Sequence, residues 1–150
     1  MSLKTQENHM RRLAELLAMD LSYIWGEKEC GPNGAKKEFL NTGKTFLRAL
    51  AKDLEFKTFA VHANPGGIGV PGDVSMKGTW PSGAGLYLTL EPYPPLSACG
   101  LYRESHGRGD GIGSRNIFLR LDWFSTCGYS AFCTELRRMD KEVNRYGAVA

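Results

Sequence analysis

A glycine-rich stretch in the second half of the chain, residues 102–116, holds the side chains best suited to chemistry. Four glycines within residues 107–113 let the backbone approach a ligand closely and adopt positive φ angles. Arginines supply forked donors that pair with phosphate or carboxylate groups, and an imidazole can change its charge near neutral pH. This combination suits an anion, a phosphate-bearing ligand or an acidic groove on a protein. The residues expected to bind such a partner here are Tyr102, Arg103, Arg108, Arg115 and Asn116.

In an alternative interpretation the same stretch is catalytic. His106 would act as acid or base on a phosphate-bearing ligand, with Glu104 and Asp110 orienting its ring and the arginines holding the anion. No serine or cysteine is paired with a base in a recognisable local pattern, and the Gly-x-Ser-x-Gly motif is absent. A long polar loop between two strands would have this composition even without a function. Because His106 would carry the acid–base chemistry alone, the sequence favours binding.

Three short motifs match functional signatures in sequence but lack the structural context that those signatures require. Gly43-Lys44-Thr45 matches the end of a phosphate-binding loop, but it lies inside a helical pattern and no strand precedes it. Glycines 67, 69 and 72 have the spacing of a dinucleotide fingerprint, yet a strand pattern follows where that fingerprint needs a helix. Arg108-Gly109-Asp110 spells an integrin-binding tripeptide, which has no use in a cytoplasmic chain. None of the three predicts a site.

A basic stripe near the end of the chain is a second candidate surface. Its residues recur every four positions on a predicted helix, which places them on one face. Acidic residues are interleaved with them, so a solvated face is the competing interpretation. The stripe consists of Arg137, Lys141 and Arg145.

Aromatic residues form a third candidate surface. They alternate with leucines along the predicted strands or lie in the loops, so helices covering the leucine face of a sheet would leave them on the other face. An aromatic face beside arginines is typical of a surface that recognises protein or single-stranded nucleic acid. The competing interpretation is that a loop or a second subunit covers it. The residues are Tyr87, Tyr93, Tyr102 and Phe118.

Composition describes an ordinary globular protein. The chain has 150 residues, 42% hydrophobic and 23% charged, which fits one domain over residues 1–150. The net charge of +3 permits an acidic partner without requiring one. No signal peptide or membrane-spanning segment is visible, so we expect a cytoplasmic chain with reduced thiols and no membrane association. The cysteines and histidines lack metal-ligand spacing, and neither a metal nor another cofactor is expected.

Hydrophobic periodicity indicates the elements that must position these residues. Apolar residues at steps of three and four predict helices over residues 6–25, 35–54 and 130–146. Gly43 lies on the apolar face of the second helix, which suggests close approach by another backbone. Alternating patterns from residue 58 to residue 122 predict about five short strands. The expected fold is α+β, an antiparallel sheet with two N-terminal helices and one C-terminal helix packed on one face.

The last two strands and their loop carry a resemblance. Leu101-Tyr102-Arg103, followed by Gly107-Arg108-x-Asp110 and Gly113-x-x-Asn116, resembles a pattern in small accessory proteins of phages and plasmids. The resemblance covers about a third of the chain and brings no catalytic residues. It implies that the partner is a host protein or a nucleoprotein complex.

Together these features predict a non-enzymatic binding protein. We expect it to dock on a macromolecule through the Arg/Gly-rich loop and the aromatic sheet face, with inhibition of a host defence system as one such role. The alternatives are the enzyme centred on His106 and direct, salt-dependent binding of nucleic acid.

Overall fold

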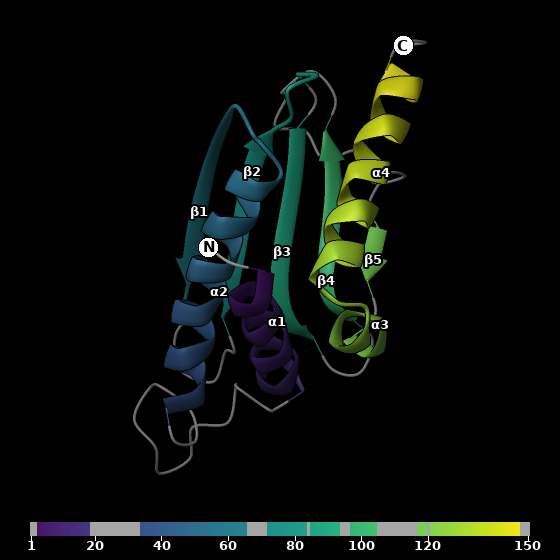
Figure 1. Cartoon of the computed structure of the whole chain (residues 1–150). Helices are drawn as coiled ribbons and strands as arrows, with labels where there is room; N and C mark the ends of the chain where they lie inside the picture. The colour runs from purple at the N-terminus through teal and green to yellow at the C-terminus, as the bar shows by residue number, and fades with distance from the viewer. Residues whose placement is uncertain are drawn as a thin grey trace.

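The computed structural model of the chain describes residues 3–18, 34–65, 72–83, 85–93, 97–104, 117–119 and 121–147. Two helices come first, a run of strands follows, and two helices close the chain (Figure 1). The helices are α1 (Leu3–Leu17), α2 (Ala35–Asp53), α3 (Leu121–Thr126) and α4 (Tyr129–Gly147). The strands are β1 (Thr58–Asn64), β2 (Asp73–Thr79), β3 (Gly85–Tyr93), β4 (Ser97–Glu104) and β5 (Ile117–Leu119).

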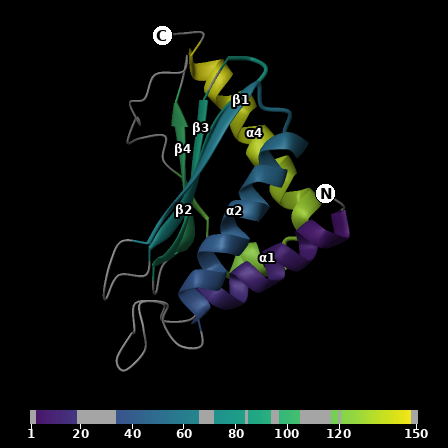
Figure 2. The ribbon, with the colours of Figure 1, turned by 90° about the vertical axis from the view of Figure 1, so that its left-hand side faces the viewer.

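The strands form one antiparallel sheet in the order β1-β2-β3-β4-β5, so each strand pairs with its neighbour in the sequence. Antiparallel strands that follow one another in the sequence can pair without a crossover connection. The described helices all lie on one face of the sheet (Figure 2). The α+β class predicted from the sequence is confirmed, and helices from both ends of the chain share that face.

The helices differ from the predicted ones in two places. α1 ends at Leu17, and the predicted continuation to Trp25 lies outside the described residues. The sequence predicts one C-terminal helix, but the structure has two, because α3 occupies the position where a strand was expected to continue to Asp122. The helical turn carries Phe124 into the core, where it is 1% exposed. Burial of this ring outweighs the weak alternating pattern of the segment.

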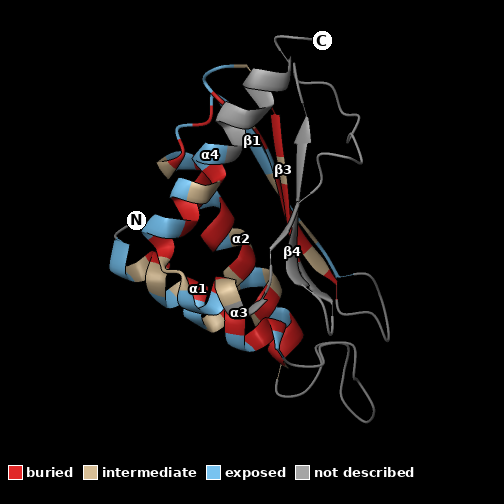
Figure 3. Cartoon of the chain, turned by 90° about the vertical axis from the view of Figure 1, so that its right-hand side faces the viewer, coloured by how far each residue is buried: buried red, intermediate tan, exposed pale blue. Residues whose placement is uncertain are grey.

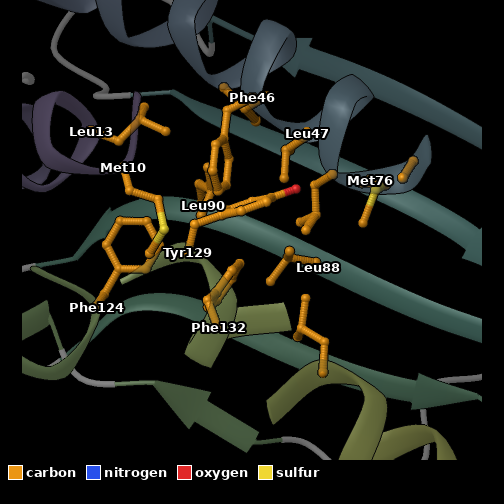
Figure 4. Packing of buried hydrophobic residues seen from close by; sticks show 14 of the residues in the cluster. Met10, Leu13, Phe46, Leu47, Met76, Leu88, Leu90, Phe124, Tyr129 and Phe132 are labelled. Atoms are coloured by element: carbon orange, nitrogen blue, oxygen red, sulfur yellow. The ribbon is translucent and has the colours of Figure 1, made fainter. Parts of the chain in front are cut away.

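The core fills the space between the sheet and the helices, where buried residues of both layers face one another (Figure 3). At its centre lies Phe46 of α2. Its ring centroid is 6.0 Å from that of Tyr129, 6.1 Å from that of Phe132 and 6.5 Å from that of Phe124. Figure 4 shows these rings beside Leu88 and Leu90 of β3. The rings tie α2, α3 and α4 to one another and to the sheet.

Two glycines allow close packing against the sheet. A Cβ atom at Gly43 would lie 2.8 Å from Cγ2 of Val74, so α2 rests directly on β2. The predicted close approach at Gly43 therefore exists, but the nearest atoms belong to a side chain and not to a backbone. At Gly78 of β2 the ring of Phe56 takes the space, because a Cβ there would lie 2.4 Å from Cδ2 of that ring.

The turn that ends α2 has a glutamate where glycine is preferred. The Phe56 amide donates to the Ala51 carbonyl at 3.2 Å, and the Glu55 amide donates to the Lys52 carbonyl at 3.0 Å. This pair of hydrogen bonds is the Schellman motif, which places the residue after the C-cap in the left-handed region. Glu55 accordingly has a φ of 61°.

We expect Glu55→Gly to raise the free energy of unfolding by about 0.5–1 kcal/mol. The left-handed conformation costs a residue with a Cβ about 1–2 kcal/mol, and the greater freedom of glycine in the unfolded chain offsets only part of that gain. Chemical denaturation measures the change. Glu55→Ala removes the charge and keeps the Cβ, so an equal gain in that control would contradict the backbone explanation.

Candidate binding face

Alternate residues of the strands face away from the helices. Val74, Met76, Leu86 and Leu88 mark the helix side, because each is at most 1% exposed and belongs to the core. The intervening positions lie on the opposite side, since successive residues of a strand point to opposite faces. We call that side the open face, and none of the described helices lies on it (Figures 2 and 3). By register its positions are Thr58, Ala60, His62, Asn64, Asp73, Ser75, Lys77, Thr79, Gly85, Tyr87, Thr89, Gly100, Tyr102, Glu104 and Phe118.

One row of the open face combines a cation with two tyrosines. The register pairs Ala60 with Lys77, Lys77 with Tyr87, and Tyr87 with Tyr102. Neighbouring strands lie about 4.8 Å apart, so these positions stand side by side across β1 to β4. Lys77 is exposed and Tyr87 is partly exposed. We call this set the tyrosine row.

On the central strands, the residues next to the tyrosine row are more buried than the row itself or have no side chain. Ser75 and Thr89, in the next row, are only 7% and 9% exposed. On the strands of the two tyrosines, Gly85 and Gly100 lie two positions away from Tyr87 and Tyr102 and add no side chain to the open face. A partner approaching β2 and β3 from this side therefore meets Lys77 and Tyr87 before the buried hydroxyl residues.

The register places three of the four predicted aromatic residues at open-face positions. Tyr87, Tyr102 and Phe118 occupy open-face positions, as their alternation with leucines indicates. The register of β3 and β4 shifts between Leu90 and Tyr93, and Tyr93 pairs with Ser97. The bulge removes Tyr93 from the open face, because Ser97 shares the helix-side alternation of β4. The periodicity of a single strand does not reveal such an inserted residue.

The register separates two of the predicted binding residues. Tyr102 pairs with Tyr87 on the open face, whereas Arg103 pairs with Leu86 on the helix side. Glu104 returns to the open face opposite Gly85. Tyr102 and Arg103 therefore do not occupy one face of β4.

The remaining residues predicted for the loop lie outside the described residues. They are His106, Arg108, Asp110, Arg115 and Asn116.

The predicted basic stripe lies on α4, and its first member already has a contact within the protein. Nη2 of Arg137 donates to the backbone carbonyl of Asp53 at 3.1 Å. Asp53 is the last residue of α2, where a cation satisfies a free carbonyl and interacts favourably with the helix dipole. Lys141 and Arg145 follow along α4. Arg137 thus joins α4 to α2, a role that its spacing in the sequence does not indicate.

Charge on the open face is mixed. Burial raises the pKa of Asp73, and the neighbouring His62 opposes that shift. Asp73 therefore takes up a proton more readily than an exposed aspartate as the pH falls. Near neutral pH the described charged side chains of the face are Asp73 and Lys77, of opposite sign.

Sequence reasoning missed a polar cluster where α1, α2 and α4 meet. The Tyr129 hydroxyl donates to Oδ2 of Asp53 at 2.5 Å, and the Tyr129 amide donates to Oε1 of Glu7 at 2.7 Å. Gln6, fully buried, donates to the Phe46 carbonyl at 3.2 Å. Burial and the Asp53 carboxylate raise the pKa of Tyr129, so its hydroxyl stays protonated as a donor. The cluster fastens three helices together, and Glu7 supplies the negative charge that the start of α4 favours.

Cys127 and Cys133 are free, and burial favours the protonated form of both thiols. Burial raises the pKa of Cys127 to about 11, and it raises that of Cys133 as well. The thiolate is the nucleophilic and metal-binding form of cysteine, so these thiols are suited to packing. Within the described parts of the chain, no group of three or more His, Cys, Asp and Glu side chains is arranged to hold a metal ion.

None of the described helices is long and apolar enough to cross a membrane. The chain matches no protein-family model, and it shows no significant similarity to a curated protein or to a solved structure.

Proposed function

We propose that the chain is a non-enzymatic binding protein that docks its open face on a macromolecular partner, a protein or the protein part of a nucleoprotein complex. The tyrosine row carries this proposal, because Lys77, Tyr87 and Tyr102 stand side by side on a face without described helices. Tyrosine is enriched among the residues that dominate the energy of protein interfaces. If the open face covered an active or binding site of a host defence complex, the chain would inhibit that complex.

The charges of the open face favour a protein partner over nucleic acid. A phosphate backbone is bound by rows of lysine and arginine. Here Asp73 lies on the same strand as Lys77, and Glu104 occupies an open-face position next to Tyr102. Acidic residues on the same face as the lysine would repel phosphates, whereas a protein surface can offer both signs of charge.

The segment after β4 supplies further residues that we propose as contacts. β4 ends at Glu104, two residues after Tyr102, so the segment that carries Arg108, Arg115 and Asn116 begins beside the tyrosine row. These residues remain proposed contacts. Lys141 and Arg145 belong to α4, which lies on the helix side of the sheet, and they are not part of the proposed surface. The enzymatic alternative through His106 and Asp110 remains a prediction from the sequence.

Affinity capture from a lysate of the organism that encodes the chain tests the proposal. We expect the immobilised chain to retain a stoichiometric protein that survives nuclease treatment. Tyr87→Ala should reduce the retained amount about tenfold or more, because truncating a central interface tyrosine costs about 2 kcal/mol. Lys77→Ala should have a smaller effect that fades as salt is raised.

Arg48→Ala is the matched control, because Arg48 is exposed on α2, on the helix side of the molecule. It should retain the partner as the unchanged chain does. Equal losses in Tyr87→Ala and Arg48→Ala would contradict docking through the open face. If the retained material disappears after nuclease treatment, the partner is nucleic acid and not protein.

A further inference from the structure

In the described part of the chain, strand β1 is an edge of the sheet that lacks several of the features by which edges are usually protected. In the described sheet it pairs with β2 alone, in a register that runs without a bulge from Thr58 to Asn64. Most of its seven residues are exposed, and none of them is Asp, Glu, Lys, Arg or Pro. Natural edges are usually protected by a charge, a proline, a bulge or short length. At the other end of the described sheet, β5 has only three residues.

An unprotected edge of this length is suited to pairing with another strand. Backbone N–H and C=O groups on alternate residues of an edge strand point away from the sheet and accept a further strand. Phe59 adds an apolar contact, because its side chain is 38% exposed although it occupies a helix-side position opposite Gly78. It is one of two large hydrophobic residues exposed in the described part of the chain.

We propose that β1 pairs antiparallel with β1 of a second copy of this chain, joining the two sheets across a twofold axis. One register pairs all seven residues, and it places Val61 on the axis. Phe59 then faces Ala63 of the second copy, and Ala60 faces its His62. A large residue meets a small one in each of these pairs, and the symmetry forms each pair twice.

Charge also favours a second copy as the occupant. No pair in this register brings two formal charges together, because the strand has none near neutral pH. Like charges directly opposite each other destabilise a strand pair, so a neutral strand pairs with itself without that cost. His62 meets Ala60 and not the His62 of the second copy, so the two imidazoles are not directly opposite each other.

Sedimentation of the full chain over a range of concentrations tests the proposal. We expect the mass to rise from 16.6 kDa towards twice that value as the concentration increases. Ala60→Lys should weaken the association at least tenfold, because it sets a lysine opposite His62 and brings two lysines close across the axis. Ala131→Lys, the same substitution at an exposed position of α4, should leave the association unchanged.

Hydrogen exchange locates the interface. In the unchanged chain, the amides of β1 should become more protected at high concentration, and in Ala60→Lys they should not. A chain that stays monomeric at every concentration overturns the proposal. A dimer that forms equally well in Ala60→Lys, or that protects residues other than β1, overturns it as well. These measurements use the chain without its partner. They can therefore disprove the dimer while docking through the tyrosine row still holds.

Discussion

Replacing Phe46 by alanine is expected to lower the free energy of unfolding by about 3–5 kcal/mol, the usual cost of truncating a buried phenylalanine. Phe46 is fully buried, and its ring contacts aromatic rings from α3 and α4. Neighbours held by two different elements cannot all move into the space that the ring leaves. For a domain of ordinary stability, this loss is a large fraction of the total.

Chemical denaturation at low protein concentration measures the effect of Phe46→Ala. Phe59→Ala is the matched control, since it removes the same atoms from a side chain that is 38% exposed. It should cost less than about 1 kcal/mol. Similar losses in the two variants would mean that the aromatic cluster does not form the centre of the core.

The second large effect is expected for Gly78→Ala, which should destabilise the fold by about 1–3 kcal/mol, the usual cost of overpacking. A Cβ at this position would lie between 2.4 and 2.9 Å from three atoms of the Phe56 ring, including Cγ. The whole ring would have to move, and it is held against Trp80 with 4.6 Å between ring centroids. Without this contact, alanine would stabilise a strand relative to glycine.

A double-mutant cycle isolates the contact between Gly78 and Phe56. The three nearest atoms to the added Cβ all belong to Phe56, so Phe56→Ala removes the clash. In that background Gly78→Ala should be neutral or stabilising. If Gly78→Ala costs the same in both backgrounds, the ring is not the cause of the loss.

The sequence predicts those parts of the fold that depend on local periodicity. The apolar stripe of α2 and the leucine alternation of β3 both give the correct buried faces. The short helix α3 escapes prediction, because six residues are too few to show a helical period and because Phe124 is held there by rings from other elements. Local pattern therefore determines the long elements, and tertiary packing determines the short one.

The candidate site is predictable to a similar degree. Alternation predicts the face of Tyr87 and Tyr102, since each stands between two helix-side positions of its strand. The bulge that removes Tyr93 and the register that separates Arg103 from Tyr102 depend on pairing between strands. The contact of Glu7 with the Tyr129 amide joins residues 122 positions apart. No local pattern can reveal it.

Docking through the open face is tested most directly by hydroxyl-radical footprinting of the complex with the captured partner. Tyr87 should be oxidised readily in the free chain and several-fold more slowly in the complex. Leu3 of α1, which is 55% exposed on the helix side, should be oxidised at the same rate in both. An unchanged rate at Tyr87, together with protection of Leu3, would place the partner on the helices and contradict the proposed function.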